Sequence, residues 1–75
     1  MEDQIKKIIS KQLGIKIDTI TNDQDLINDL KADSLDTVEL MMSIEEQFGI
    51  DFSEEDVGSL STVQSVIDFV KRLSA

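Results

Sequence analysis

The longest helical pattern in the sequence is DSLDTVELMMSIEEQFG, residues 33–49. Its interior contains no Gly or Pro, Asp33 or Ser34 can cap its start, and Gly49 ends it. The side chains on one face repeat with the spacing of a core stripe, and they are Thr37, Leu40, Met41, Ile44 and Phe48. The pattern therefore predicts a helix over residues 35–47 with one buried face.

The same helix carries a second apolar strip. At about 100° per residue, Leu35, Val38 and Met42 gather between roughly 40° and 100° from Ser34, away from the core stripe near 300°. The acidic residues that border this strip are Glu39, Glu45 and Glu46. A narrow apolar strip with an acidic rim is typical of a transient docking surface, and a flexible Met42 suits several partners. The alternative is that Leu35 and Val38 pack under the preceding loop.

Residues 5–13 repeat Ile and Leu at helical spacing, and Gly14 follows where a left-handed cap is common. Ser53 can cap a short helix over residues 53–57, whose first turn is acidic.

The last helix is expected to begin near Ser61 or Thr62, and Ser61 with Gln64 has the spacing of a capping box. Its expected buried stripe is Val63, Val66, Ile67, Val70 and Leu73.

Residues 15–33 have no clean period, and a structureless connection of this length is unusual in a compact domain. Apolar side chains can hold it against the core, namely Ile15, Ile17, Ile20, Leu26, Ile27 and Leu30. Leu26, Ile27 and Leu30 also have the spacing of a short helical turn. Ile50 and Phe52 alternate like a strand, but no second strand is available to pair with them.

We expect an all-α fold, a small helical bundle of three main helices plus one short helix, with a long loop after the first helix, forming a single domain over residues 1–75.

The composition argues against catalysis by the chain itself. Its 75 residues contain no Cys, which excludes a disulfide framework and a Cys-based metal site, and no His, which removes the commonest general base and the commonest metal ligand. We therefore expect no enzyme activity, no catalytic residues and no metal site.

The formal charge of −9 disfavours binding of nucleic acid and favours binding of partner proteins with basic patches. No apolar run reaches the roughly 20 residues that span a bilayer, and the start lacks the pattern of a signal peptide, so we expect a cytoplasmic monomer without membrane insertion.

The run DLKADSLDTVEL, residues 29–40, closely resembles the attachment site of acyl carrier proteins, whose hallmark is Asp-Ser-Leu. The segments MMSIEEQFGI (41–50), TVQ (62–64) and IDFV (67–70) continue the resemblance, which covers nearly the whole chain. The tripeptide alone is a weak signal, whereas the extended run is a strong one. The sequence departs from the family at Lys31, where the family usually has Gly.

The resemblance implies that a phosphopantetheinyl transferase attaches 4′-phosphopantetheine from coenzyme A to Ser34, with Asp33, Leu35 and Asp36 beside it. The arm then supplies the thiol that this chain lacks, and it carries growing fatty acyl chains as thioesters to the enzymes of fatty acid synthesis. The resemblance also implies that the transferase recognises Asp33 and Asp36. The residues expected to dock partners are Leu35, Asp36, Val38, Glu39, Met42, Glu45 and Glu46.

Two alternatives remain at this point. A carrier of the same fold can serve polyketide assembly or D-alanine transfer, although the continuation DTVEL favours fatty acid synthesis. A different class is an acidic, divalent-cation-binding interaction domain built on the loop of residues 18–33. No window there supplies the spacing of an EF-hand, while loose cation binding by clustered carboxylates remains open.

Overall fold

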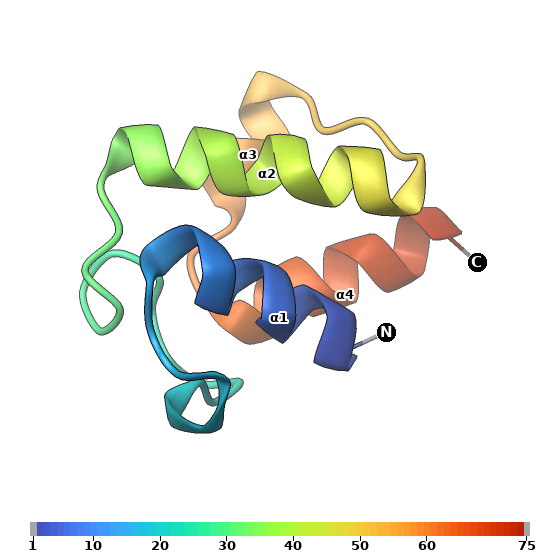
Figure 1. Cartoon of the computed structure of the whole chain (residues 1–75). Coiled ribbons are helices and arrows are strands. Elements are labelled where there is room, and N and C mark those ends of the chain that lie inside the picture. The colour runs from blue at the N-terminus through green and yellow to red at the C-terminus, as the bar shows by residue number, and fades with distance from the viewer. Residues whose placement is uncertain (1, 75) are drawn as a thin grey trace.

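The computed structural model describes residues 2–74, which form four α-helices and one short 3-10 helix. In chain order the elements are α1 (Glu2–Leu13), η1 (Ile17–Thr19), α2 (Ser34–Phe48), α3 (Glu54–Ser59) and α4 (Val63–Ser74). The three long helices pack into a bundle, and α3 lies on the segment that returns the chain from α2 to α4 (Figure 1). The expected all-α bundle is confirmed, and none of the described helices is long and apolar enough to cross a membrane.

The core lies where α1, α2 and α4 meet. The helical residues buried there are Ile5, Ile9, Thr37, Leu40, Met41, Ile44, Val63, Val66, Ile67 and Val70. Phe48 is only partly buried. The prediction for Leu73 was wrong, because its side chain is 44% exposed in the final turn of α4, beyond the last buried residue.

The helix ends follow local chemistry at most positions. Gly14 and Gly49 both adopt a left-handed backbone, with φ of 67° and 65°, where the sequence places the ends of α1 and α2. The start of α4 differs from expectation. Thr62 Oγ1 accepts the N–H of Ser65 at 3.1 Å and Ser65 Oγ accepts the N–H of Thr62 at 3.0 Å, so the box joins these two residues instead of Ser61 and Gln64.

The long connection is fixed to the core at Ile20 and Leu26, which are both buried. It also pairs with the segment before α4, since the N–H of Leu26 donates to the carbonyl of Ser61 at 2.8 Å. Ile27 points outward with 57% of its surface exposed, so the expectation that it pins the loop was wrong. Residues 26–30 form a hydrogen-bonded turn without becoming a helix.

The acids of this loop stabilise its turns. Asp25 Oδ1 accepts the N–H groups of Ile27 and Asn28, each at 2.9 Å, and Asp29 Oδ2 accepts the N–H of Asp25 at 2.7 Å. Within residues 2–74 no three acidic residues converge into a group able to hold a metal ion. Through their backbone contacts, Asp25 and Asp29 act as local caps of this turn.

Candidate functional site

Ser34 is the first residue of α2, and its side chain is exposed. The cap of this helix is Asp33, whose Oδ1 accepts the N–H of Asp36 at 2.8 Å. Asp36 completes the box by accepting the N–H of Asp33 on Oδ2 at 3.3 Å. Because Asp33 supplies the cap, the hydroxyl of Ser34 is not required for it.

Ser53 shows the difference. It also is an exposed serine at the start of a helix, but it occupies the cap position itself, and its Oγ accepts the N–H of Asp56, three residues later, at 3.1 Å. The hydroxyl of Ser53 is therefore part of the cap of α3, whereas that of Ser34 extends from a helix already capped by its neighbour. The two serines thus have different local roles, because Ser53 occupies the cap position of its helix and Ser34 the position after the cap.

The first turn of α2 suits a phosphate on Ser34. The capping box uses the N–H groups of Asp33 and Asp36, and it does not use those of Ser34 and Leu35. Backbone N–H groups and the positive end of a 15-residue helix dipole favour a negative group, by about 0.3–1 kcal/mol. The residues present therefore fit a phosphodiester at this position.

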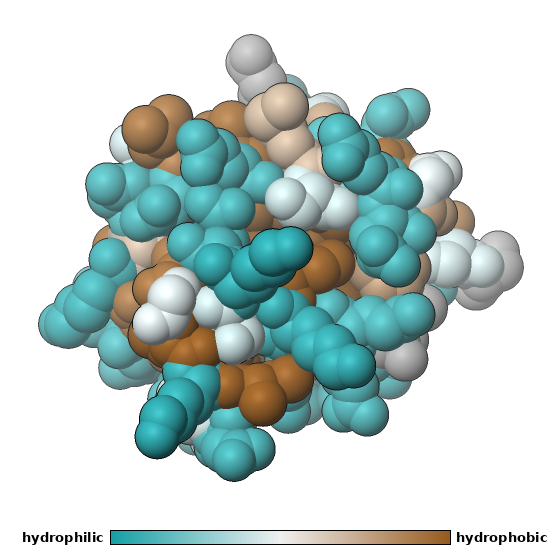
Figure 2. All heavy atoms as spheres, in the orientation of Figure 1, coloured by the Kyte–Doolittle hydropathy of each residue, from teal (hydrophilic) through white to brown (hydrophobic). Residues whose placement is uncertain are grey.

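The second apolar strip of α2 lies on the surface. Leu35, Val38 and Met42 are 66%, 48% and 55% exposed, so neither Leu35 nor Val38 is buried under the preceding loop. Figure 2 shows hydrophobic side chains among hydrophilic ones over the start of α2, at the upper left of the view, and further hydrophobic areas toward the lower left. The strip follows directly on Ser34 along the helix.

The acids beside the strip have different surroundings. Glu39 is exposed and accepts a hydrogen bond from Nε2 of Gln12 in α1 at 2.8 Å. Glu45 is half-buried, and its Oε2 accepts the N–H of Phe52 at 2.8 Å, which ties α2 to the segment before α3. Glu46 is exposed. The sequence analysis placed all three on the rim but did not identify the second role of Glu45.

A cleft of about 440 Å³ opens between α2 and the α3 region. Its lining residues are Val38, Met41, Met42, Glu45, Phe52, Ser53 and Val57. The ring of Phe52 stacks on that of Phe69 in α4, with centroids 5.0 Å apart and planes at 24°, while Arg72 Cζ lies 5.5 Å from the Phe69 centroid. Two residues of the expected docking strip, Val38 and Met42, thus line an apolar space. The sequence did not predict this cleft, because the other wall of the cleft comes from residues 52–57.

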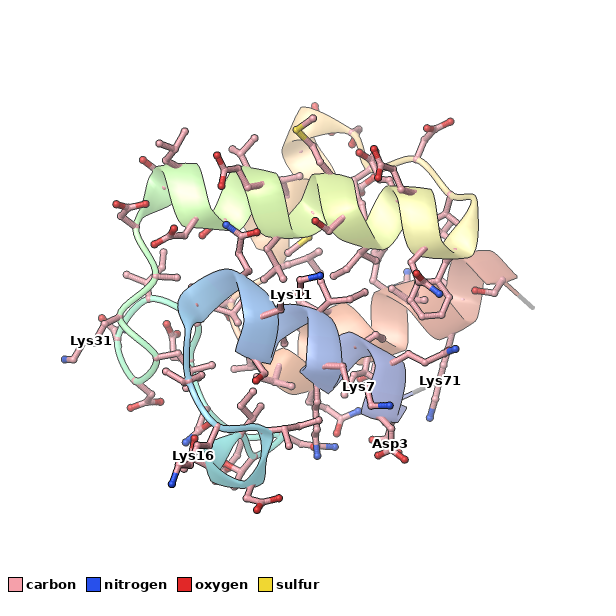
Figure 3. The ribbon with its side chains drawn as sticks, viewed as in Figure 1. Asp3, Lys7, Lys11, Lys16, Lys31 and Lys71 are labelled. Carbon is pink, nitrogen blue, oxygen red and sulfur yellow. The ribbon has the colours of Figure 1, made fainter. Side chains whose placement is uncertain are left out.

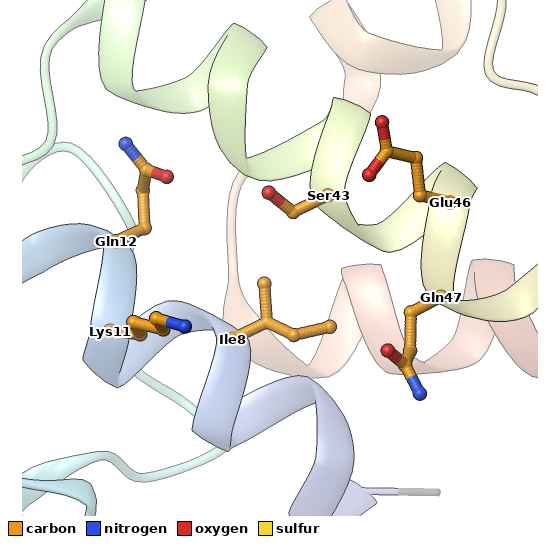
Figure 4. A pocket seen from close by; sticks show the side chains of 6 residues that line it. All are labelled: Ile8, Lys11, Gln12, Ser43, Glu46 and Gln47. Carbon is orange, nitrogen blue, oxygen red and sulfur yellow. The ribbon is translucent and has the colours of Figure 1, made fainter.

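A second cleft, of about 660 Å³, lies between α1 and α2. Its walls are Ile8, Lys11 and Gln12 from α1 and Ser43, Glu46 and Gln47 from α2 (Figure 4). Polar groups from both helices dominate it, so it offers little to an apolar chain. The cleft beside α3 is the apolar one of the two.

Lys31, three residues before Ser34, has a φ of 62°. A side chain in this left-handed region costs roughly 1–2 kcal/mol relative to the ordinary helical region, and Gly avoids that cost. Lys31 is exposed, whereas the next residue, Ala32, is buried. The departure from the family pattern therefore falls at a backbone position that favours glycine.

Comparison with known proteins identifies the family of the chain. Residues 3–70 match the family described as "Phosphopantetheine attachment site". The chain is 54% identical over 70 residues to an acyl carrier protein of Buchnera aphidicola subsp. Schizaphis graminum, covering 93% of this chain and 89% of the relative. It is 51% identical over 72 residues to that of Buchnera aphidicola subsp. Acyrthosiphon pisum (strain Tuc7), covering 96% and 90%.

The fold gives the same result. A solved structure from Mycobacterium tuberculosis, described as a candidate acyl carrier protein, superimposes with a TM-score of 0.90 at 32% identity and covers 95% of each chain. The chain is thus a phosphopantetheine-attachment domain, as the family match over most of its length shows. It belongs to the acyl carrier protein family.

Proposed function

We propose that this protein carries fatty acyl groups as thioesters on a 4′-phosphopantetheine arm attached to Ser34. The observation that supports this most directly is the exposed Ser34 at the first position of α2, with the helix capped by Asp33. The arm supplies the thiol on which an acyl group is held. The chain itself presents that group, and partner enzymes contribute the catalytic residues.

The attachment is a group transfer carried out by a phosphopantetheinyl transferase. The Ser34 oxygen forms the new bond to the phosphorus of coenzyme A that bears the pantetheine, the pyrophosphate bond from that phosphorus to the adenosine bisphosphate portion breaks and this portion leaves, and the hydroxyl proton passes to a base of the transferase. Asp33 and Asp36 lie on either side of Ser34 and Leu35 and are the acids that the transferase would recognise. Their engagement in the capping box fixes their positions before the partner arrives.

Partner enzymes would dock on the strip of Leu35, Val38 and Met42 with basic patches facing the acidic rim. The exposure of the strip and the net charge of −9 support this, because opposite charge steers association and a small apolar contact stabilises the complex. The rim residues proposed for this contact are Asp36, Glu39, Glu45 and Glu46. The proposal includes action as a monomeric single domain over residues 1–75 in the cytoplasm, which size-exclusion chromatography and cell fractionation test.

The cleft between α2 and the α3 region would shelter the acyl chain. Val38, Met41 and Met42 form one wall, and Phe52 and Val57 contribute to the other. Burying each CH₂ group is favourable by about 0.8 kcal/mol, so partial insertion would remove a fatty acyl chain from water. Methionine side chains adapt to chains of different length.

The test is to incubate the apo protein with coenzyme A and a broad-specificity transferase and to measure the intact mass. The wild type should gain one phosphopantetheine, and the Ser34→Ala variant should gain none. Ser43→Ala, which removes another hydroxyl from the same helix, should be modified like the wild type. A folded wild type without the increment, or a modified Ser34→Ala variant, would overturn the proposal.

A further inference from the structure

Lys31 has a backbone conformation that its neighbours impose. It is the one non-glycine residue with positive φ within residues 2–74. The N–H of Leu30 donates to the carbonyl of Asp25 at 3.0 Å, and the N–H of Ala32 donates to the carbonyl of Leu26 at 2.9 Å. Both sides of Lys31 are thus fixed to the same turn. A long side chain is present where glycine would be easier to accommodate, and such outliers gather at functional sites.

The charge of Lys31 is isolated as well. It is the only basic residue between Lys16 and Lys71 in the sequence. Figure 3 shows its side chain extending from the loop that leads into α2, at a distance from Lys7, Lys11 and Lys71. The other charged residues near it in the sequence are acidic, namely Asp29, Asp33 and Asp36. A phosphodiester on Ser34 would therefore join a local field that is negative except for this lysine.

We propose that Lys31 is a positioning residue whose ammonium group pairs with the phosphodiester carried by Ser34 and holds the root of the arm on the loop side of α2. This inference rests on the proposed attachment at Ser34. Three residues of extended chain span about 11 Å at most, and the four-carbon stem of lysine bridges much of such a distance. A charge-assisted bond from ammonium to phosphate restricts the directions in which the arm leaves the helix.

The neighbouring carboxylates already have backbone partners. Asp33 Oδ1 accepts the N–H of Asp36 at 2.8 Å, and Asp29 Oδ2 accepts the N–H of Asp25 at 2.7 Å. Each contact partly satisfies the negative group, whereas the phosphodiester brings a new charge. A role for Lys31 toward the arm must therefore appear as a difference between the apo and phosphopantetheine-loaded proteins. A purely structural role would be the same in both.

The experiment compares melting temperatures of the apo and loaded forms of the wild type and of Lys31→Gln, with loading confirmed by intact mass. At low salt, the shift in melting temperature on loading should be higher for the wild type than for Lys31→Gln by roughly 1–4 °C. This advantage should disappear in 0.5 M NaCl, where the pair is screened. Lys16→Gln removes the same charge from a remote exposed position and should respond to loading like the wild type.

A second readout follows the lysine itself. The ammonium nitrogen and adjacent carbon of Lys31 should change their NMR chemical shifts on loading, while those of Lys16 should not. Two results would overturn this inference and leave the proposed function intact. One is a loaded wild type whose Lys31 signals do not move, and the other is an equal effect of loading on the melting temperatures of the wild type and of Lys31→Gln. A wild type that accepts no phosphopantetheine would overturn the proposed function, and the inference would fall with it.

Discussion

α2 and α4 are similar in length and pack into the same core, but they differ on their outer faces. Outside its buried residues α4 exposes mainly polar side chains such as Asp68 and Lys71, with one apolar residue, Leu73, in its last turn. α2 exposes a row of three apolar side chains that begins next to Ser34. The packing of α2 against the core leaves these three side chains exposed, which is why we propose that they bind partners.

The largest effects on stability should come from substitutions on the buried faces of α2 and α4. Ile44→Ala in α2 and Ile67→Ala in α4 each remove a fully buried side chain and should lower the free energy of unfolding by about 2–5 kcal/mol. A domain of this size has little more stability than that, so both variants should be largely unfolded at 37 °C. Urea titration followed by circular dichroism measures the loss. If either variant were as stable as the wild type, the assignment of the core would be wrong.

The outer faces should separate the helices in function. Leu35→Ser and Val38→Ser should each reduce kcat/KM of the transferase by on the order of tenfold, because they remove apolar contact at a docking surface. Their free energies of unfolding should stay within about 0.5 kcal/mol of the wild type, as expected for exposed positions. Leu73→Ser is the matched control on α4 and should leave kcat/KM unchanged. An equal loss in all three variants would argue against a defined docking strip.

The capping residues should show similar, smaller effects at both helices. Asp33→Ala removes the cap of α2 and Thr62→Ala that of α4, and each should lower the free energy of unfolding by about 1 kcal/mol. Asp33→Ser retains a capping oxygen and should recover most of the loss at α2. Thermal melts of the apo proteins give the comparison. A stable Asp33→Ala variant would mean that Ser34 takes over the cap.

The smallest effect should be a gain in stability just before α2. Lys31→Gly relieves the cost of a positive φ but makes the unfolded chain more flexible, so the net gain should be about 0.5–1 kcal/mol. Lys31→Gln retains a side chain at this φ and should show no such gain in the apo protein. The melting temperatures of the two apo variants test this directly. A destabilised Lys31→Gly variant would show that the lysine side chain contributes favourable contacts.

The sequence predicted features that depend on near neighbours. The helix spacing, Gly14, Gly49 and the second strip of α2 follow from periodicity and local backbone preference, and the structure agrees with them. The 3-10 helix η1 was not predicted, because its three residues are too few to show a period. Choosing between Asp33 and Ser34 as the cap also required coordinates, since both residues are competent.

Features that depend on distant residues were not predicted. Asn22 donates to Gln64 Oε1 at 2.8 Å across 42 positions, so Gln64 binds the long loop and does not take part in the box expected with Ser61. Two residues that line the cleft beside α3 are joined in the same way, since Glu45 accepts the N–H of Phe52, seven positions away in a segment without a period. Neither partner has a pattern that identifies the other. Such contacts become visible only when the helices are packed together.

The stack of Phe52 on Phe69 makes the molecule easy to observe by spectroscopy. The chain has three phenylalanines and no tryptophan or tyrosine, so absorbance at 280 nm is negligible and the aromatic NMR region contains phenylalanine signals alone. Two rings 5.0 Å apart shift each other's proton resonances, and Arg72 lies close enough for the ring current of Phe69 to shift its proton resonances as well. Phe52 lines the apolar cleft, so movement of that wall alters these shifts. The native protein therefore contains its own unlabelled reporter of opening at the cleft.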